Sequence, residues 1–313
     1  MRRARIAQIV LGMIWLIDGL LQFQPSFFGR AFVTDVLLPN AAGQPGVISG
    51  PITWIADVIA PHVAVFNGFA AVLQVAIGLS LIAGRMVRPA LAVSFVWGAG
   101  IWFVGEGLGA IFTGTANPLT GAPGAALLYV LAGLMCWPRA GGDGLGLIGV
   151  RGARWAWAAI WLGSAALWLA PANRGPGAVQ SAIASVPTGA GWLDHIVVWA
   201  ASATAGDGTP IAILMAVLSA AIACAVLAEI DAGLFLGLAI VISLVFWIVG
   251  QGLGGVFTGQ STDVNSAPLM MLIASMLLGA RTLRTRRAPA WPGAARTARR
   301  VGVVGLSAAD HAR

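Results

Sequence analysis

The sequence predicts an all-α integral membrane protein of eight transmembrane helices, arranged as two parallel-repeat four-helix bundles with extracytoplasmic amphipathic segments. Three observations lead to this fold class: the composition, a set of long apolar segments, and a passage that occurs twice. Of the 313 residues, 58% are hydrophobic and only 9% are charged, whereas soluble domains carry about 25% charged residues. A chain so poor in charge is expected to lie in a lipid bilayer.

Eight segments are apolar enough to form membrane-spanning helices, which need about 20 residues each. They cover residues 5–23, 62–84, 89–112, 122–137, 154–171, 210–230, 232–257 and 267–280. The basic, then apolar, start of the chain also resembles a signal peptide. Because Asp18 interrupts the apolar stretch and no small-residue cleavage site follows, we expect an uncleaved first helix.

The arginines predict the orientation of these helices. All eighteen basic residues are arginines. With a cytoplasmic N-terminus, sixteen of them lie on the cytoplasmic side, and only Arg30 and Arg174 lie outside. This positive-inside bias predicts cytoplasmic N- and C-termini in the cell (plasma) membrane. Anionic lipid accounts for the net charge of +7, so the expected partner is the bilayer and not nucleic acid.

One passage occurs twice in the chain. The sequences "FVGEGLGAIFTGTANPLTGAP" (103–123) and "IVGQGLGGVFTGQSTDVNSAP" (248–268) match without a gap at a shift of 145 residues. At a shift of 146 the first helix repeats, with Trp15 matching Trp161. An even number of helices per repeat gives both halves the same orientation, about an axis along the membrane normal.

The repeat predicts a division of the chain. We expect a first four-helix repeat at 1–140, a glycine-rich cytoplasmic linker at 141–153, a second four-helix repeat at 154–287 and a disordered cytoplasmic tail at 288–313. Segments 24–61 and 172–209, which follow the first helix of each half, carry the apolar spacing and tryptophans of amphipathic helices at the membrane surface.

The glycines around Glu106 do not form a nucleotide-binding loop, because no strand precedes them and they lie in a membrane segment. Small residues there favour close packing of helices, with Gly114 and Gly259 as left-handed helix ends. The alternative is a broken helix that exposes its backbone to a ligand.

Glu106 is a candidate functional residue, because an acid within a membrane span is costly unless it is paired, hydrated or protonated. Asp18 and Glu106 each lie seven residues before the expected outer end of their helix, about 10 Å deep. We therefore expect them to share a cavity and to retain at least one proton. The full predicted proton or ligand site consists of Asp18, Glu106, Gln22, Asn67 and Gln74.

The second half replaces both acids by neutral residues. Ser164 corresponds to Asp18 and Gln251 corresponds to Glu106, which indicates one active half and one scaffold half. The alternative is that the two acids are protonated and only tie helices together by hydrogen bonds.

Other reactive side chains do not form a recognisable motif. His62 and His195 could bind haem or a metal, but they do not correspond in the repeat and have no ligand spacing. We expect histidines at the membrane interface and no metal site. The two cysteines are isolated and predict packing roles, and no catalytic residue can be assigned.

The stretch "GMIWLIDGLLQ", Gly12 to Gln22, resembles the opening helix of the DoxX/DoxD-like membrane proteins. The resemblance implies a compact four-helix unit that serves as a membrane subunit of a quinone-linked redox complex, with quinone as cofactor and a protein partner or homo-oligomer. This chain departs from the family in carrying two such units, and in having Gln22 where a basic residue is common. Two alternatives remain: a transporter of a small solute or ion with an intramembrane acidic site, and a non-catalytic scaffold of an envelope complex.

Overall fold

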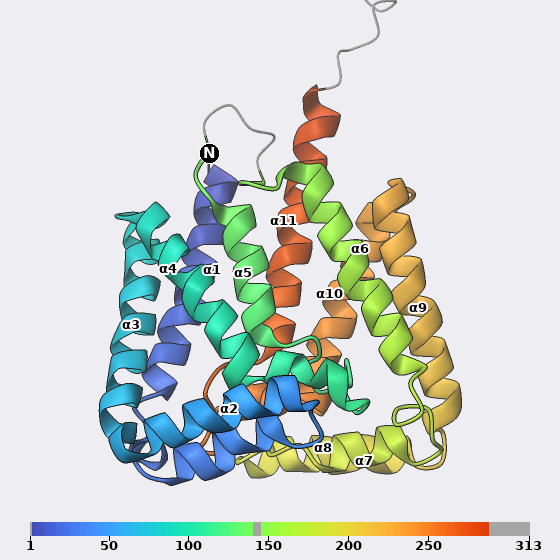
Figure 1. The fold of residues 1–313 in the computed structure, drawn as a ribbon. Coiled ribbons are helices and arrows are strands. Elements are labelled where there is room, and N and C mark those ends of the chain that lie inside the picture. Colours follow the sequence, from blue (N-terminus) through green and yellow to red (C-terminus); the bar gives the residue numbers. More distant parts are fainter. Residues whose placement is uncertain (1, 140–144, 288–313) are drawn as a thin grey trace, which may run out of the picture.

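The computed structural model describes residues 2–139 and 145–287, and every regular element in these ranges is a helix (Figure 1). A helix forms in each of the eight predicted membrane segments. These are α1 (Arg2–Leu21), α3 (Val63–Ala83), α4 (Val87–Gly100), α5 (Ala125–Cys136), α6 (Gly149–Trp168), α9 (Gly208–Ala228), α10 (Ala232–Val245) and α11 (Ser266–Arg287). The predicted tail at 288–313 and residues 140–144 of the linker region lie outside the described residues.

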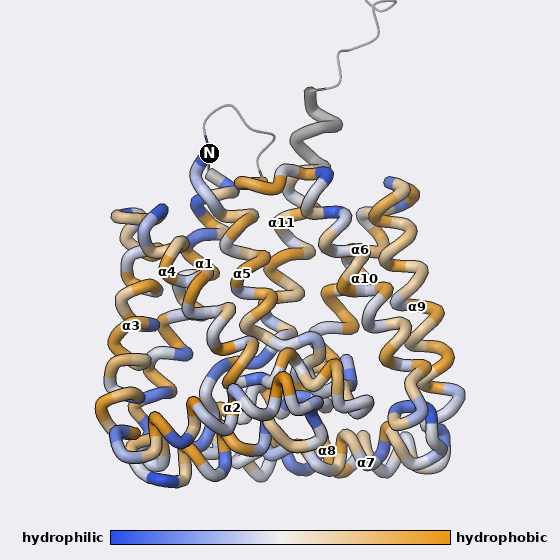
Figure 2. The backbone as a smooth tube through the Cα atoms, in the orientation of Figure 1, coloured by the Kyte–Doolittle hydropathy of each residue, from blue (hydrophilic) through white to orange (hydrophobic). Residues whose placement is uncertain are grey.

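Five helical stretches are long and apolar enough to cross a bilayer, judged by length and composition. They are 3–21, 46–83, 87–105, 208–228 and 232–250, and α5 and α11 contribute shorter apolar stretches. Figure 2 shows the apolar residues running along these helices. The protein is therefore an α-helical, membrane-embedded protein.

The long helices form one bundle with α5 and α11 near its centre (Figure 1). On one side α1 packs along α3, and on the other side α6 packs along α9. One of the hydrophobic core clusters runs from Trp15 and Leu128 to Trp157 and Ile273. Both halves of the sequence thus contribute to the same core.

A layer of short helices lies across one end of this bundle (Figure 1). It contains α2 (Gly46–Ile59), α7 (Ala178–Ala184) and α8 (Gly191–Ala203), and we call it the cap layer. The predicted amphipathic segments supply all three. In α2 the side chains of Ile52 and Ala56 are buried, whereas Trp54 on the other face is exposed. Shorter turns join α2 to its neighbours: η1 (Pro25–Phe28), η2 (Phe32–Leu37), η3 (Leu38–Ala41) and η4 (Ala60–His62).

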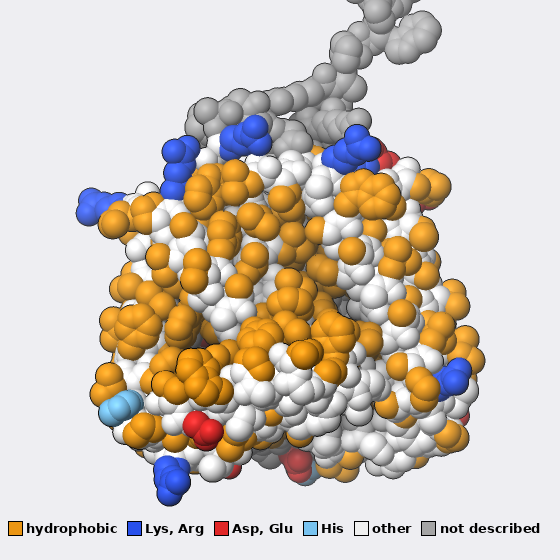
Figure 3. All heavy atoms as spheres, in the orientation of Figure 1, with side chains coloured by type: hydrophobic (Ala, Val, Ile, Leu, Met, Phe, Trp, Pro, Cys, Tyr) orange, Lys and Arg blue, Asp and Glu red, His pale blue; other side chains and the backbone are white. Residues whose placement is uncertain are grey.

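The opposite end of the bundle carries the start of α1 and the end of α11 (Figure 1). In Figure 3 most basic side chains of the visible face gather at this end, and apolar side chains cover the middle of the molecule. The two termini of the described chain therefore lie at the more basic end.

Two predicted helices end early, which corrects the expected spans 89–112 and 232–257. α4 continues only through η5 (Ile101–Gly105), and α10 only through η7 (Phe246–Gly250). The chain then winds left-handed in η6 (Gly107–Thr113) and η8 (Gly252–Gly255), with φ of 57° at Leu108 and 55° at Leu253. Left-handed conformation costs an L-residue about 1–2 kcal/mol. Of the two interpretations of the glycine-rich passage, the broken helix describes the structure. Gly114 and Gly259 do have the predicted left-handed φ.

Gly109 and Gly254 explain how the break is tolerated. Both have positive φ. A Cβ added to Gly109 would collide with the backbone of Pro123, and a Cβ added to Gly254 would lie only 2.6 Å from the Cα of Val264. In parallel, Trp102 Nε1 donates to Pro123 O at 2.8 Å and Trp247 Nε1 donates to Val264 O at 2.9 Å.

These contacts correct the register of the repeat. They pair Pro123 with Val264, whereas the ungapped shift of 145 pairs Pro123 with Pro268. The bonded residues are 21 positions apart in the first half and 17 positions apart in the second. The loop of the second half is therefore four residues shorter than that of the first.

The loops after the broken helices cross between the halves. Loop 114–124 reaches the second half, where Asn173 Nδ2 donates to Ala116 O at 2.7 Å. Loop 256–265 reaches the first half, where Ser26 Oγ donates to Gly259 O at 2.9 Å. Non-helical backbone at membrane depth is tolerated where it is buried in protein or lines a cavity. The halves therefore interlock through both loops and the shared core.

Candidate functional site

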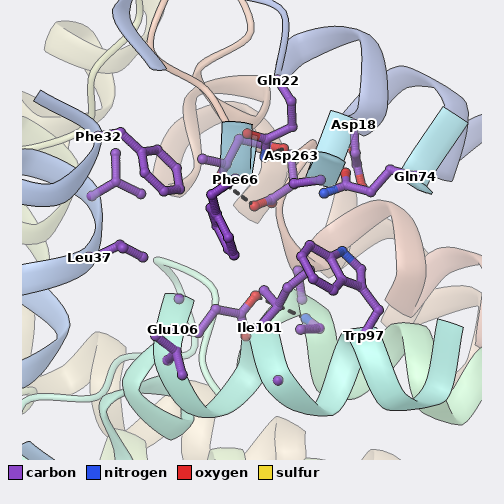
Figure 4. A pocket seen from close by; sticks show the side chains of 18 of the residues that line it. Asp18, Gln22, Phe32, Leu37, Phe66, Gln74, Trp97, Ile101, Glu106 and Asp263 are labelled. Carbon is purple, nitrogen blue, oxygen red and sulfur yellow. Dashed lines mark hydrogen bonds between the residues drawn. The ribbon is translucent and has the colours of Figure 1, made fainter. Parts of the chain in front are cut away.

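A cavity of about 240 Å³ lies in the first half of the bundle, next to the cap layer (Figure 4). Its polar lining comes from α1, α3, α5, the break after α4, and the loop of the second half. The polar residues are Asp18, Gln22, Gln74, Glu106, Tyr129, Thr262 and Asp263, and the aromatic ones are Trp15, Phe32, Phe66 and Trp97. The remaining wall is aliphatic side chains, alanine and glycine.

Asp18 is almost fully buried, and both of its carboxylate oxygens accept hydrogen bonds. The hydroxyl of Tyr129 on α5 donates to Oδ2. The backbone N–H of Val264, in the loop that crosses from the second half, donates to Oδ1 at 3.2 Å. Asp18 thus ties three separate elements together at the wall of the cavity.

Glu106 lies at the break between η5 and η6. Its Oε1 accepts the N–H of Ala126 at 2.9 Å, in the first turn of α5, where unpaired backbone N–H groups favour a carboxylate. Its Oε2 is buried and has no hydrogen-bond partner among the residues that the structure describes. Gly124 leaves the space for this carboxylate, because a Cβ there would collide with Oε2.

Asp263 supplies a third carboxyl that was not predicted. Its Oδ1 accepts the N–H of Asn265 at 2.6 Å, and its Oδ2 accepts the hydroxyl of Thr262 at 2.9 Å. Burial raises the pKa of the Asp263 carboxyl above its ordinary value, and the two hydrogen bonds offset this in part. The charge of Asp263 acts on both Asp18 and Glu106.

The other predicted site residues divide into two groups. Gln22 and Gln74 line the cavity. The Gln22 amide donates to Thr262 O at 3.3 Å, and in the described part of the chain its buried Oε1 has no partner. Asn67 does not line the cavity, because its amide instead donates to the backbone carbonyl of Gln22 at 2.7 Å. Asn67 therefore positions the end of α1.

The cavity places the acids on two sides. Figure 4 shows Asp18, Gln22, Gln74 and Asp263 along one side and Glu106 on the other, with Phe66 and Trp97 between them. The rings of Phe66 and Trp97 are 6.2 Å apart, and those of Phe32 and Phe66 are 6.1 Å apart. A molecule in the cavity would meet both acids and aromatic faces.

A second, much smaller cavity of about 30 Å³ lies in the second half. It is lined by Ser164, Trp168, Ser219 and Gln251, the counterparts in the repeat of Asp18, Gln22, Gln74 and Glu106. Gln251 Oε1 accepts the N–H of Ala267 in the first turn of α11 at 3.1 Å, as Glu106 does at α5. The volume of this second cavity is about that of one water molecule.

The corrected register extends this correspondence to the third acid. If Pro123 pairs with Val264, then Ala122 pairs with Asp263, and Ala122 lines the second cavity. Each of the three carboxyls therefore has a neutral counterpart. The sequence analysis did not anticipate that the loop of the second half brings Asp263 into the first cavity.

Sequence reasoning missed Asp263 and Tyr129, although each had a signal. Asp263 is the only charged side chain between residues 232 and 280, and Tyr129 is the only tyrosine of the chain. The sequence did not indicate that loop 256–265 of the second half crosses to the first half and brings Asp263 close to Asp18.

His62 and His195 lie in separate segments, η4 and α8, and both are exposed. Within the ranges that the structure describes, no three His, Cys, Asp or Glu side chains are grouped so that they could hold a metal ion. Cys136 is buried and Cys224 is exposed, and neither forms a disulfide.

The chemistry of the first cavity follows from its lining. Three carboxyls face it, and within residues 2–139 and 145–287 no arginine or histidine lines it. Such a cluster can hold protons or exchange them for another positively charged species. Comparison with known proteins found no matching family model, no similar curated protein and no similar solved structure.

Proposed function

We propose that this protein is a multi-pass membrane carrier that binds a small solute in the first cavity and exchanges protons at Asp18, Glu106 and Asp263. One observation carries the proposal: three acids from three elements converge on one cavity inside the bundle. An acid at such a place is a functional candidate by default. A purely structural role would not require that all three be absent from the equivalent cavity of the second half.

The broken helices favour the same function. Many membrane carriers bind their solute at discontinuous helices, where freed backbone groups and helix ends line the site. Here the break after η5 directs Glu106 towards the start of α5. The four residues from Gly107 to Ala110 keep a left-handed conformation there.

For topology, we propose eight crossings of the cell membrane, cytoplasmic termini, and two halves related by an axis along the membrane normal. The start of α1 and the end of α11 lie at the same end of the bundle (Figure 1), which requires an even number of crossings. The matching breaks, loops and cavities of the two halves support a parallel repeat.

Cysteine labelling tests this topology. In a background with Cys224 replaced by serine, cysteines at Val47 in α2 and Asp194 in α8 should react with an impermeant reagent added outside intact cells, because both positions are exposed. A cysteine at Arg85, between α3 and α4, should react only after the membrane is opened. The reverse pattern would contradict the proposed orientation.

The carrier function is tested with the purified protein alone in lipid vesicles that enclose a pH-sensitive dye. Addition of amines, alcohols and carboxylates in turn should move protons for at least one class, and Glu106→Gln should abolish that movement. No proton movement with any solute class would overturn the proposal.

A quinone-linked redox subunit, as the first-helix resemblance implies, is the second candidate. The apolar and aromatic wall suits a quinone ring. Quinone carbonyls accept hydrogen bonds, and the buried lining atoms without a partner among the described residues are two donors, Trp15 Nε1 and Trp97 Nε1, and two acceptors, Glu106 Oε2 and Gln22 Oε1. The two indole N–H groups suit the quinone carbonyls, but a quinone would leave both acceptors unsatisfied. Purification from native membrane would favour this candidate if a redox partner and a quinone remained bound.

A further inference from the structure

The electrostatics of the first cavity constrain its ligand. Asp18, Glu106 and Asp263 all line it, and none of the arginines or histidines that the structure describes does. Lysine is absent from the whole chain. Any two of these carboxyls in their charged form repel an anion and attract a cation.

The free acceptors of the cavity point to a ligand that donates hydrogen bonds. Glu106 Oε2 and Gln22 Oε1 are buried acceptors without a partner among the described residues, and the indole N–H groups of Trp15 and Trp97 are buried donors without one. Leaving a buried acceptor unsatisfied is costly, and a ligand with several N–H groups would satisfy both acceptors. An ammonium group offers three donors and no acceptor.

The remaining wall of the cavity indicates that the other end of the ligand is apolar. Phe66 and Trp97 lie between the acidic sides (Figure 4), and the face of an aromatic ring attracts a cation. Beyond them the wall consists of aliphatic side chains such as Leu37, Ile55 and Ile59. A metal ion would gain nothing from this wall, whereas an organic ion would.

We infer that the cavity binds a small organic cation: a protonated amine with an aromatic or aliphatic tail. The ammonium group contacts Glu106, with Asp18 and Asp263 on the facing side, and the tail packs towards the cap layer. One proton leaves the carboxyl cluster as the cation enters. This inference rests on the proposed binding role of the cavity and adds its substrate class.

Three probes of similar shape test the charge preference. They are 2-phenylethylamine, 2-phenylethanol and 3-phenylpropanoate, which carry a positive, a neutral and a negative head on the same ring. Binding to the full chain in lipid nanodiscs is measured by titration calorimetry, with empty nanodiscs subtracted. The amine should bind at least about tenfold more tightly than the alcohol, or about 1.4 kcal/mol, and the propanoate more weakly still. Equal binding of amine and alcohol, tighter binding of the propanoate, or no binding of the amine would overturn the inference.

Variants locate the binding. Glu106→Gln and Asp263→Asn should each lower the amine affinity about tenfold or more and leave the alcohol unchanged. Asp194→Asn is the matched control, because Asp194 is an exposed acid on α8 away from the cavity lining. Glu106→Gln retains an Oε1 acceptor for Ala126, and glutamine already occupies the equivalent position 251. An equal loss in Asp194→Asn would overturn the inference, because general surface charge would then explain the preference.

The vesicle measurement separates this inference from the carrier proposal. Amine binding without proton movement would overturn the carrier function, but the inference that the cavity binds an organic cation would stand. Proton movement driven by the alcohol or the propanoate, but not by the amine, would overturn the organic-cation inference, but the carrier function would stand.

Discussion

At the scale of single residues, Glu106 and Gln251 occupy equivalent places and differ by one terminal group. The Oε1 of each accepts an N–H from the first turn of the next helix. The Gln251 amide also donates to the Ser266 hydroxyl at 3.2 Å, whereas no described residue donates to Glu106 Oε2. Because glutamine caps a helix here as well as glutamate does, capping alone does not explain the acid.

Two single substitutions, each giving one residue the identity of the other, test this argument. Glu106→Gln should leave the thermal unfolding midpoint nearly unchanged and reduce solute-driven proton movement at least about tenfold, the effect of losing about 1.4 kcal/mol of binding. Gln251→Glu should not create a second active site, because Ser164 and Ala122 supply no further acid. Unchanged proton movement in Glu106→Gln would instead favour the scaffold or a purely structural acid.

The pKa of Asp263 predicts a pH dependence. Burial raises this pKa above the ordinary 3.8, so Asp263 takes up its proton at a higher pH than an exposed aspartate does. Since the neutral acid attracts a cation less, amine affinity should fall as the pH is lowered, and the fall should begin above the ordinary aspartate range.

The same measurement must account for the other titratable groups that line the cavity, which are Asp18 on α1, Glu106 after η5 and Tyr129 on α5. Calorimetric titrations of the amine from neutral to acidic pH, with wild type and Asp263→Asn, separate these contributions. The variant should show a shallower dependence. An affinity that rises on acidification would contradict the assigned role of the carboxyls.

Part of the site could be predicted from the sequence, because Asp18 and Glu106 stand out from their neighbours along the chain. Asp18 and Glu106 interrupt apolar runs, and comparison of the halves shows that both change together. Asp263 lies in a polar loop, where an acid is unremarkable, and it reaches the site only because Val264 bonds to Asp18 across 246 residues of chain. No local pattern encodes a contact of that range.

At the scale of elements, a helix lies in each of the eight segments that hydropathy marked, five described stretches are long and apolar enough to span a membrane, and the breaks after Gly105 and Gly250 were the main error. Glycines that allow close helix packing and glycines that allow a left-handed turn look the same in a sequence. The distinction comes from the loop that returns against the turn, where Gly109 contacts Pro123 and Gly254 contacts Val264.

Alanine at either turn should therefore destabilise the protein. Gly109→Ala and Gly254→Ala place a Cβ at positive φ and against backbone, which together cost at least about 2 kcal/mol. Gly237→Ala in α10 is the control, because nothing lies within 4 Å of its added Cβ and alanine favours a helix. Thermal unfolding in detergent should show a lower midpoint for the two turn variants only. A normal midpoint for both would contradict the observed turns.

At the scale of the whole molecule, the second half acts on the site in two ways. Its core residues pack with those of the first half, and its loop delivers Asp263 and the Val264 N–H to Asp18. The sequence repeat alone predicts two bundles side by side. The exchanged loops make each bundle incomplete without the other.

This interlocking predicts that the halves remain together when the chain is cut between them. A protease site inserted within residues 140–144 would allow cleavage of the purified protein, with an affinity tag on the N-terminal half. After cleavage in mild detergent, the C-terminal half should stay on the affinity resin, and the cleaved protein in vesicles should keep its solute-driven proton movement. The shared core and the loop contacts Asn173–Ala116 and Ser26–Gly259 hold the pieces without a covalent link. Release of the C-terminal half from the resin would contradict the interlocked bundle. Proton movement by the separated first half alone would show that Asp263 is dispensable.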